Sequence, residues 1–150
     1  LLDGGYAAQP ALGAEIETGA DDAPRSDFPL DGVDADRRVD ATWVRARLGD
    51  PNVVFVDARS AGEYASGHIP GAVSLDWQGN VEGIALRPRD ELQARHAELP
   101  EQATLVAYCQ TGSRAAMAYF VMRYLGLSDV RLYDGSMVEW AADPDNPIEP

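Results

Sequence analysis

The residues best suited to chemistry lie in one short stretch, Ala-Tyr-Cys-Gln-Thr-Gly-Ser-Arg-Ala-Ala, at positions 107–116. It contains Cys109, the only cysteine of the 150 residues, directly after an apolar run and before a run with helical character. A thiolate is a strong nucleophile, and it is stabilised where backbone N–H groups and the N-terminus of a helix converge on it. Single free cysteines are often inert buried residues, but this context favours a nucleophile.

The residues that follow Cys109 suit such a site. They are Gln110, Thr111, Gly112, Ser113 and Arg114. Gly112 allows the backbone angles that a tight loop requires, and Arg114 adds a fixed positive charge at the mouth of the loop. Only four residues separate the cysteine from the arginine, one fewer than in the loop with which protein tyrosine phosphatases surround a phosphoryl group. The smaller loop favours one added atom on the thiolate, such as a persulfide sulfur held by several N–H donors.

Alternating strands and helices are expected to position this loop. The strands are expected at residues 53–57, 72–75, 104–108 and 130–133, and the helices at residues 40–48, 60–67, 87–99, 113–125 and 136–141. This alternation predicts an α/β fold with a mostly parallel sheet. Ligands bind beyond the carboxyl ends of parallel strands, so the loop after strand 104–108 lies where a ligand is expected.

Three charged residues near the end of strand 53–57 are candidates for supporting roles. Asp57 is expected to orient the cysteine loop, to hold Arg59 or Arg114, or to act only as a structural cap. Arg59 and Glu63 stand four residues apart, which favours an ion pair on one face of a helix.

The two histidines do not predict a metal site. His68 lies in a Gly-His-Ile-Pro-Gly turn and is expected to bond the nearby backbone, whereas His96 lies in a charged helix and is expected to face solvent. No pair of carboxylates stands at ligand spacing around either histidine. The sequence therefore predicts neither a metal nor another cofactor.

The composition argues against several classes of partner. The chain has 25 acidic and 12 basic residues, a net charge of −13, and all of its basic residues are arginine. Such a chain repels nucleic acids and anionic membranes, and it offers no lysine for Schiff-base chemistry. No apolar run is long enough to span a membrane, and the first residues do not form a secretory signal. With a single cysteine, these features predict a cytoplasmic location.

The first forty residues have a different character from the rest. Residues 7–38 are rich in Ala, Gly, Pro and Asp and lack an apolar period, as expected of a linker. The first six residues, Leu-Leu-Asp-Gly-Gly-Tyr, are similar to Leu-Tyr-Asp-Gly-Ser-Met at 132–137. A duplicated domain cut just before its last strand would show this similarity.

The sequence resembles the rhodanese family of sulfurtransferases over residues 39–142. The resemblance rests on Val-Phe-Val-Asp-Ala-Arg-Ser-Ala-Gly-Glu-Tyr-Ala-Ser-Gly-His-Ile-Pro-Gly-Ala-Val-Ser at 54–74, on the cysteine loop, and on Leu-Tyr-Asp-Gly-Ser-Met-Val-Glu-Trp at 132–140. It implies a three-layer α/β domain whose central, mostly parallel, five-stranded sheet is flanked by helices.

The resemblance is to the C-terminal catalytic domain of bacterial members with two domains in tandem, which use thiosulfate or 3-mercaptopyruvate. In many such members the first domain is inactive and ends in Asp-Gly-Gly. The resemblance implies that residues 1–6 end a preceding inactive domain, which packs against the catalytic one. Residues 7–38 would then be an acidic interdomain linker, and residues 39–150 the catalytic domain.

The resemblance also implies a two-step transfer without a cofactor. Cys109 would take the outer sulfur of a small anionic donor as a persulfide and pass it to cyanide or a thiol. Residues 110–114 would bind the substrate, with Arg114 holding the donor anion, and Asp57, Arg59 and Glu63 would support them. The loop Cys-Gln-Thr-Gly-Ser-Arg differs from the Cys-Arg-Lys-Gly-Val-Thr and Cys-Gly-Ser-Gly-Val-Thr loops of the thiosulfate-specific and mercaptopyruvate-specific members. Thiosulfate is the expected donor, and mercaptopyruvate is the alternative.

Three other functions are compatible with the same residues. A phosphatase or arsenate reductase would use the same thiolate, although the short loop argues against it. A rhodanese-like binding module would need no cysteine, yet Cys109 is present. A persulfide carrier loaded by a protein partner would differ from the enzyme in its donor rather than in its chemistry.

Overall fold

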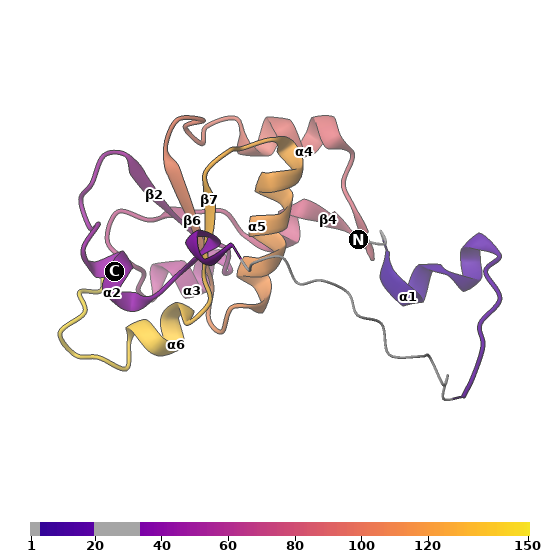
Figure 1. Ribbon diagram of the computed structural model, residues 1–150, viewed down its shortest axis with the longest axis horizontal. Helices are drawn as coiled ribbons and strands as arrows, with labels where there is room; N and C mark the ends of the chain where they lie inside the picture. The colour runs from indigo at the N-terminus through magenta and orange to yellow at the C-terminus, as the bar shows by residue number, and fades with distance from the viewer. Residues whose placement is uncertain (1–3, 20–33) are drawn as a thin grey trace.

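The computed structural model describes residues 4–19 and 34–150 (Figure 1). Its helices are α1 (Gly5–Ala8), α2 (Ala41–Arg45), α3 (Ala61–Ala65), α4 (Arg89–His96), α5 (Ser113–Leu125) and α6 (Ser136–Trp140). Its strands are β1 (Arg38–Val39), β2 (Val53–Asp57), β3 (Val73–Ser74), β4 (Val81–Glu82), β5 (Ala85–Leu86), β6 (Thr104–Tyr108) and β7 (Val130–Tyr133). Three short 3₁₀ turns are η1 (Pro10–Leu12), η2 (Ala35–Arg37) and η3 (Trp77–Asn80).

Five strands form the central sheet in the order β1-β7-β6-β2-β3, and every neighbouring pair is parallel. Strand β6 lies in the middle, so the residue that follows it emerges at the centre of the carboxyl edge. The α/β prediction and the parallel sheet are confirmed. The fifth strand is Arg38–Val39, which pairs with Leu132 and Tyr133 of β7.

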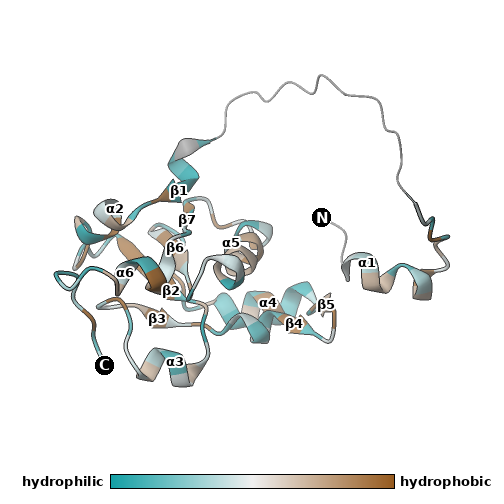
Figure 2. Cartoon of the chain, turned by 90° about the horizontal axis from the view of Figure 1, so that it is seen from below, coloured by the Kyte–Doolittle hydropathy of each residue, from teal (hydrophilic) through white to brown (hydrophobic). Residues whose placement is uncertain are grey.

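Helices cover both faces of the sheet, which gives the three expected layers (Figure 2). Successive strand residues point to opposite faces, and β6 shows this plainly. Val106 and Tyr108 join the cluster that contains residues of α2 and α6, whereas Leu105 and Ala107 join the cluster that contains residues of α5. Cys109 continues the alternation and belongs to the α5 cluster.

The caps and ends of the helices follow from local chemistry. Asp40 caps α2 as predicted, because its side chain accepts a hydrogen bond from the N–H of Trp43 at 2.8 Å. Helix α4 is shorter than predicted and begins at Arg89 rather than at Arg87. Pro88 explains the later start, because a proline disfavours helical angles in the residue before it. The antiparallel pair β4–β5, which precedes α4, was not predicted from the sequence.

The N-terminal segment lies apart from the sheet (Figure 1). Within residues 4–19 it contains the short helix α1 and the turn η1, and its side chains are largely exposed. Residues 1–3 and 20–33, on which parts of the predicted domain end and linker fall, lie outside the described residues. The division into 1–6, 7–38 and 39–150 therefore stays a prediction. No helix among the described residues is long and apolar enough to cross a membrane.

Candidate active site

Cys109 lies directly after the central strand β6, at the start of the loop that leads into α5. Its side chain is completely buried. The sulfur accepts a hydrogen bond from the N–H of Gly112 at 3.2 Å. Within the cysteine loop, residues 109–114, the backbone N–H of Gly112 therefore points toward the sulfur.

The loop stabilises the thiolate form of Cys109. Burial raises the pKa of the thiol, but hydrogen bonds from the backbone N–H groups of Ala115, Thr111, Gly112 and Arg114 lower it by more. The net result is a pKa below the ordinary value. A larger fraction of Cys109 is therefore the nucleophilic thiolate at neutral pH.

Gly112 is the one loop residue whose identity the backbone requires. Its φ is +94°, an angle that L side chains rarely adopt. A Cβ at this position would also lie 2.8 Å from the carbonyl oxygen of Asp134, in the turn after β7. The cysteine loop is thus packed against the β7–α6 turn too closely for any side chain here.

Arg114 forms a two-pronged ion pair with Glu63 rather than standing free. Its Nη1 and Nη2 atoms each donate to one oxygen of Glu63 at 2.7 Å. These hydrogen bonds chiefly, together with those from Ser60 and against the effect of burial, lower the pKa of Glu63 to about 2. The Glu63 carboxylate chiefly, and the nearby Cys109 sulfur as well, raise the pKa of Arg114. The positive charge at the loop mouth is therefore present but already compensated.

Asp57 holds Arg59, which was one of its predicted roles. Both groups are buried, and the Nε and Nη2 atoms of Arg59 donate to the Asp57 carboxylate at 2.7–3.0 Å. The predicted pair between Arg59 and Glu63 is wrong. Ser60 caps α3, so Arg59 lies before the first helical residue. The Arg59 side chain therefore turns back toward strand β2. Glu63 instead completes the capping box with Ser60 and reaches Arg114.

Ser136 is a neighbour of Cys109 that the sequence analysis did not identify. Its hydroxyl accepts a hydrogen bond from the N–H of Cys109 at 3.1 Å and donates to the carbonyl of Tyr133 at 3.0 Å. Its oxygen lies 4.0 Å from the Cys109 sulfur. Ser136 also has a positive φ of 54°, which is uncommon without a functional or structural reason. That backbone angle was the only local signal, and it is not visible in the sequence.

The two histidines form their hydrogen bonds with the backbone and not with Cys109. His68 bonds the carbonyl of Tyr64 through Nδ1 at 3.1 Å, which confirms the expected turn role. The predicted exposure of His96 is wrong, because it is buried on the same face of α4 as Leu92. Among residues 4–19 and 34–150, no group of three or more His, Cys, Asp or Glu is arranged to hold a metal ion.

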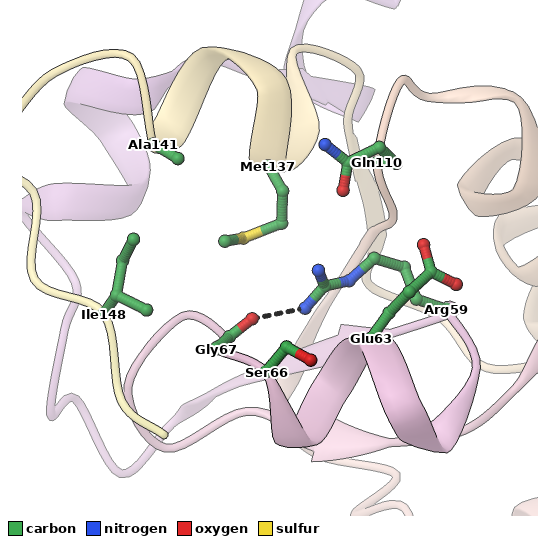
Figure 3. Close-up of a pocket in the computed structure, with 8 residues that line it drawn as sticks. All are labelled: Arg59, Glu63, Ser66, Gly67, Gln110, Met137, Ala141 and Ile148. Atoms are coloured by element: carbon green, nitrogen blue, oxygen red, sulfur yellow. Dashed lines mark hydrogen bonds between the residues drawn. The ribbon is translucent and has the colours of Figure 1, made fainter.

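A pocket of about 360 Å³ opens beside the cysteine loop (Figure 3). Gln110 brings the loop to the pocket, and the N–H of Met137 anchors that wall by donating to the carbonyl of Cys109 at 3.0 Å. The lining residues are Arg59, Glu63, Ser66, Gly67, Gln110, Met137, Ala141 and Ile148. Of the residues predicted for the site, Arg59, Glu63 and Gln110 thus line this pocket, and Asp57 and Arg114 are held to it through their ion pairs with Arg59 and Glu63.

Several known proteins with similar sequences are sulfurtransferases. Thiosulfate sulfurtransferase of Corynebacterium glutamicum is 34% identical to 99% of this chain, and the match covers 56% of the bacterial protein. A probable 3-mercaptopyruvate sulfurtransferase of Pseudomonas aeruginosa gives the same identity and the same two coverages. The chain therefore spans a little over half the length of these relatives.

A solved structure with a similar fold is that of wild-type EanB. It matches 99% of this chain and 40% of its own chain at a TM-score of 0.84 and 27% identity. The model of the rhodanese-like domain matches residues 40–143, which include every candidate residue described above except Ile148. The chain belongs to the rhodanese family.

Proposed function

We propose that this protein is a thiosulfate sulfurtransferase that carries the transferred sulfur on Cys109 as a persulfide. The observation that supports this most directly is the position of the Cys109 sulfur, with backbone N–H groups directed at it and a lowered pKa. A persulfide adds one anionic sulfur where those donors point. The proposed first step needs no other nucleophile.

The reaction proceeds in two steps that balance without an external oxidant. The Cys109 thiolate attacks the outer sulfur of thiosulfate, the sulfur–sulfur bond of the donor breaks, and sulfite leaves with the electron pair. Cyanide or a thiolate then attacks the outer sulfur of the persulfide, and the electron pair returns to Cys109. The loop N–H groups stabilise the negative charge in both steps.

The relatives support this chemistry. A yeast protein, 35% identical over 94 residues, is a thiosulfate:glutathione sulfurtransferase. One structure of EanB contains a cysteine persulfide in a tetrahedral intermediate state with ergothioneine. Sulfur transfer through a cysteine is therefore the function that similar proteins and the geometry of this loop favour together.

A second donor, 3-mercaptopyruvate, is favoured by one observation. Arg114 is already paired with Glu63, so a doubly charged donor gains less from it than from a free cation. Mercaptopyruvate carries its carboxylate at a distance from the reacting sulfur, so its binding depends less on Arg114. The equal identity to a probable mercaptopyruvate sulfurtransferase is in line with this alternative.

A preceding domain remains part of the proposal. The pocket lined by Gln110 opens to solvent, and a relative matched over 99% of this chain is nearly twice as long as the match. We propose that an inactive rhodanese-like domain packs against this one and that both work in the cytoplasm. The partners of the protein would then be a small anionic donor and a thiol or cyanide acceptor, not nucleic acid or a membrane.

Intact-mass spectrometry tests the proposal. After incubation with thiosulfate the protein is expected to gain the mass of one sulfur atom, and cyanide is expected to remove it. Mercaptopyruvate in a parallel reaction identifies the better donor. Cys109→Ser should gain no sulfur from either donor while its circular dichroism stays that of the wild type. Sulfur uptake by Cys109→Ser, or none by the wild type, would contradict the assignment.

A further inference from the structure

The wall of the pocket opposite α3 is completed by a residue outside the family match. The match ends at residue 143, yet Ile148 lines the pocket with Met137 and Ala141 of the α6 region. Figure 3 shows the Ile148 side chain on the side away from Glu63, facing the same space as the Met137 side chain. This wall is therefore specified in part by residues that the family pattern leaves open.

The segment that carries Ile148 is fixed to the domain on both sides of it. Glu149 pairs with His68 through two backbone hydrogen bonds of 2.8 and 3.0 Å, and its carboxylate accepts from the N–H of Gly71 at 2.8 Å. On the other side, the indole N–H of Trp140 donates to the carbonyl of Pro147 at 2.9 Å. Ile148 lies between these anchors and is held against Gly67, where a Cβ would be 2.7 Å from its Cγ2 atom.

The pocket has one apolar side and one polar side. Met137, Ala141 and Ile148 form the apolar side, and Arg59 and Ser66 belong to the polar side. A bound molecule that left the apolar side in contact with water would gain no binding free energy from that side. Burying apolar surface there favours a molecule that has carbon as well as sulfur.

The charges around the pocket also favour an acceptor that has carbon as well as sulfur. Arg59 is paired with Asp57, and Arg114 is paired with Glu63, so the two cations and two anions cancel formally. Of the Arg59 nitrogens, Nε and Nη2 make hydrogen bonds to Asp57 and Gly67. Figure 3 shows the remaining terminal nitrogen directed into the pocket. The pocket thus offers an apolar wall opposite polar groups whose formal charges are compensated, rather than a strong anion site.

The size of the pocket also exceeds that of an inorganic acceptor. Its volume of about 360 Å³ corresponds to roughly 12 water molecules at about 30 Å³ each. Cyanide or sulfite would fill a small part of it and would leave the wall of Met137 and Ile148 without contact.

We propose that Ile148 is a specificity-determining residue for the acceptor and selects small aliphatic thiols over inorganic ions. The proposal rests on the sulfurtransferase function above. The thiolate sulfur of the acceptor bonds to the outer sulfur of the Cys109 persulfide, the bond to Cys109 breaks, and its electron pair stays on Cys109. The carbon chain of the acceptor meanwhile packs against Met137 and Ile148. The acceptor leaves as an alkyl persulfide.

The test measures the second step alone in the full chain. The protein is first loaded with thiosulfate and freed of excess donor, and discharge of the persulfide is then followed with propanethiol or with cyanide. Ile148→Ala is expected to raise the half-saturating concentration of propanethiol about 3- to 10-fold relative to that of cyanide. Ile84→Ala is the matched control, because it removes the same atoms from an exposed position between β4 and β5.

Two further variants separate the wall from general damage. Ile148→Phe should narrow the pocket, so that branched or longer thiols lose more affinity than propanethiol does. We expect Glu149 to act as a positioning residue, because its carboxylate holds the segment to Gly71. Glu149→Ala removes that carboxylate. It should weaken the preference for propanethiol over cyanide in the same direction as Ile148→Ala, with a smaller change in the maximal rate of discharge.

The outcomes distinguish this proposal from the function on which it rests. If no persulfide forms on the wild type, the sulfurtransferase function itself is wrong. If the persulfide forms and Ile148→Ala changes both acceptors equally, or changes neither, Ile148 does not determine specificity. A change of the same size in Ile84→Ala would also overturn the proposal.

Discussion

The guanidinium of Arg114 lies between two negative groups, the Glu63 carboxylate and the Cys109 sulfur. Both raise its pKa, and Glu63 contributes the larger part. A cation shared in this way stabilises the thiolate less than a free cation would, so most of the stabilisation comes from the backbone N–H groups. Glu63 therefore limits how strongly the loop attracts an anionic donor.

Replacing Glu63 with glutamine should strengthen the binding of thiosulfate. Glutamine can still accept a hydrogen bond from Ser60 and keep the capping box, but it leaves the charge of Arg114 uncompensated. We expect the KM for thiosulfate to fall about 2- to 5-fold, the range typical of a partly exposed ion pair. The pH profile of persulfide formation should also shift to lower pH, because the freed cation lowers the pKa of Cys109 further.

The matched control is Glu91→Gln. Glu91 forms an ion pair with Arg87 on the exposed side of α4, away from the cysteine loop, and its loss should leave KM and the pH profile as they are. A higher KM in Glu63→Gln would show that Glu63 matters by orienting Arg114 rather than by neutralising it.

Single residues of the site differed in how well the sequence predicted them. Cys109, Gly112 and Arg114 were predictable because they lie within six residues of one another, between a strand and a helix. The partners of Arg114 and Cys109 were not, because Glu63 and Ser136 lie 51 and 27 residues away in the chain. Spacing within a helix suggested a pair for Glu63, but a capping serine gave that side chain another direction.

At the scale of elements, helix α4 places a titratable side chain in the protein interior. His96 is buried with its Nδ1 2.8 Å from the carbonyl of Leu92, and its Nε2 has no hydrogen-bond partner among the described residues. Burial is the main reason that its pKa falls below the ordinary value of 6.5, with the Leu92 carbonyl opposing it and Arg95 adding to it. The neutral imidazole is therefore the form that the folded protein accepts.

The stability of the protein should fall as the pH drops below 6.5, in part because of His96. In this range the unfolded chain binds a proton at His96 and the folded chain does not, so unfolding becomes more favourable until the lowered pKa is passed. His96→Leu should lose this part of the dependence. Urea unfolding between pH 7 and about pH 5 should show a smaller decrease in the free energy of unfolding for the variant.

Equal decreases in the two proteins would show that His96 is protonated in the folded state as readily as in the unfolded one. The window matters, because Glu63, Asp129 and Asp143 have lowered pKa values. A carboxylate with a lowered pKa loses its contribution to stability as the pH falls through the acid range, so the comparison is made between pH 7 and about pH 5.

Elements were predictable where a local pattern was sufficient. Short apolar runs predicted β2 and β6, because these central strands bury most of their side chains, and the apolar composition of residues 113–125 predicted α5. Strand β1 has two residues, Arg38 and Val39, and exists only through its pairing with β7. His96 shows a related limit: a charged sequence concealed a buried face, since only its four-residue spacing from Leu92 marked it.

At the scale of the whole molecule, the sheet order brings three separate loops to one edge. Asp57 ends β2 and Arg59 follows it, Cys109 follows β6, and Ser136 follows β7. These three strands are neighbours in the order β7-β6-β2. The strands could be predicted from the sequence, but their order in the sheet could not, because strand order depends on long-range packing rather than on local pattern.

Amide hydrogen exchange should reflect this order. Strand β6 is paired on both sides, by β7 and β2, whereas β1 and β3 are short and lie at the edges. We expect the amide protons of β6 to exchange most slowly and those of β1 and β3 to exchange much faster. Exchange from β6 as fast as from the edges would mean that the sheet opens as one unit.

The central place of β6 has a consequence for heat inactivation. The cysteine loop begins at the end of the strand that local fraying reaches last, so brief opening of the sheet edges leaves the sulfur and its N–H donors in place. Warming should therefore not produce a folded but inactive form. Loss of sulfur transfer and loss of the native circular dichroism should occur over the same range of temperature.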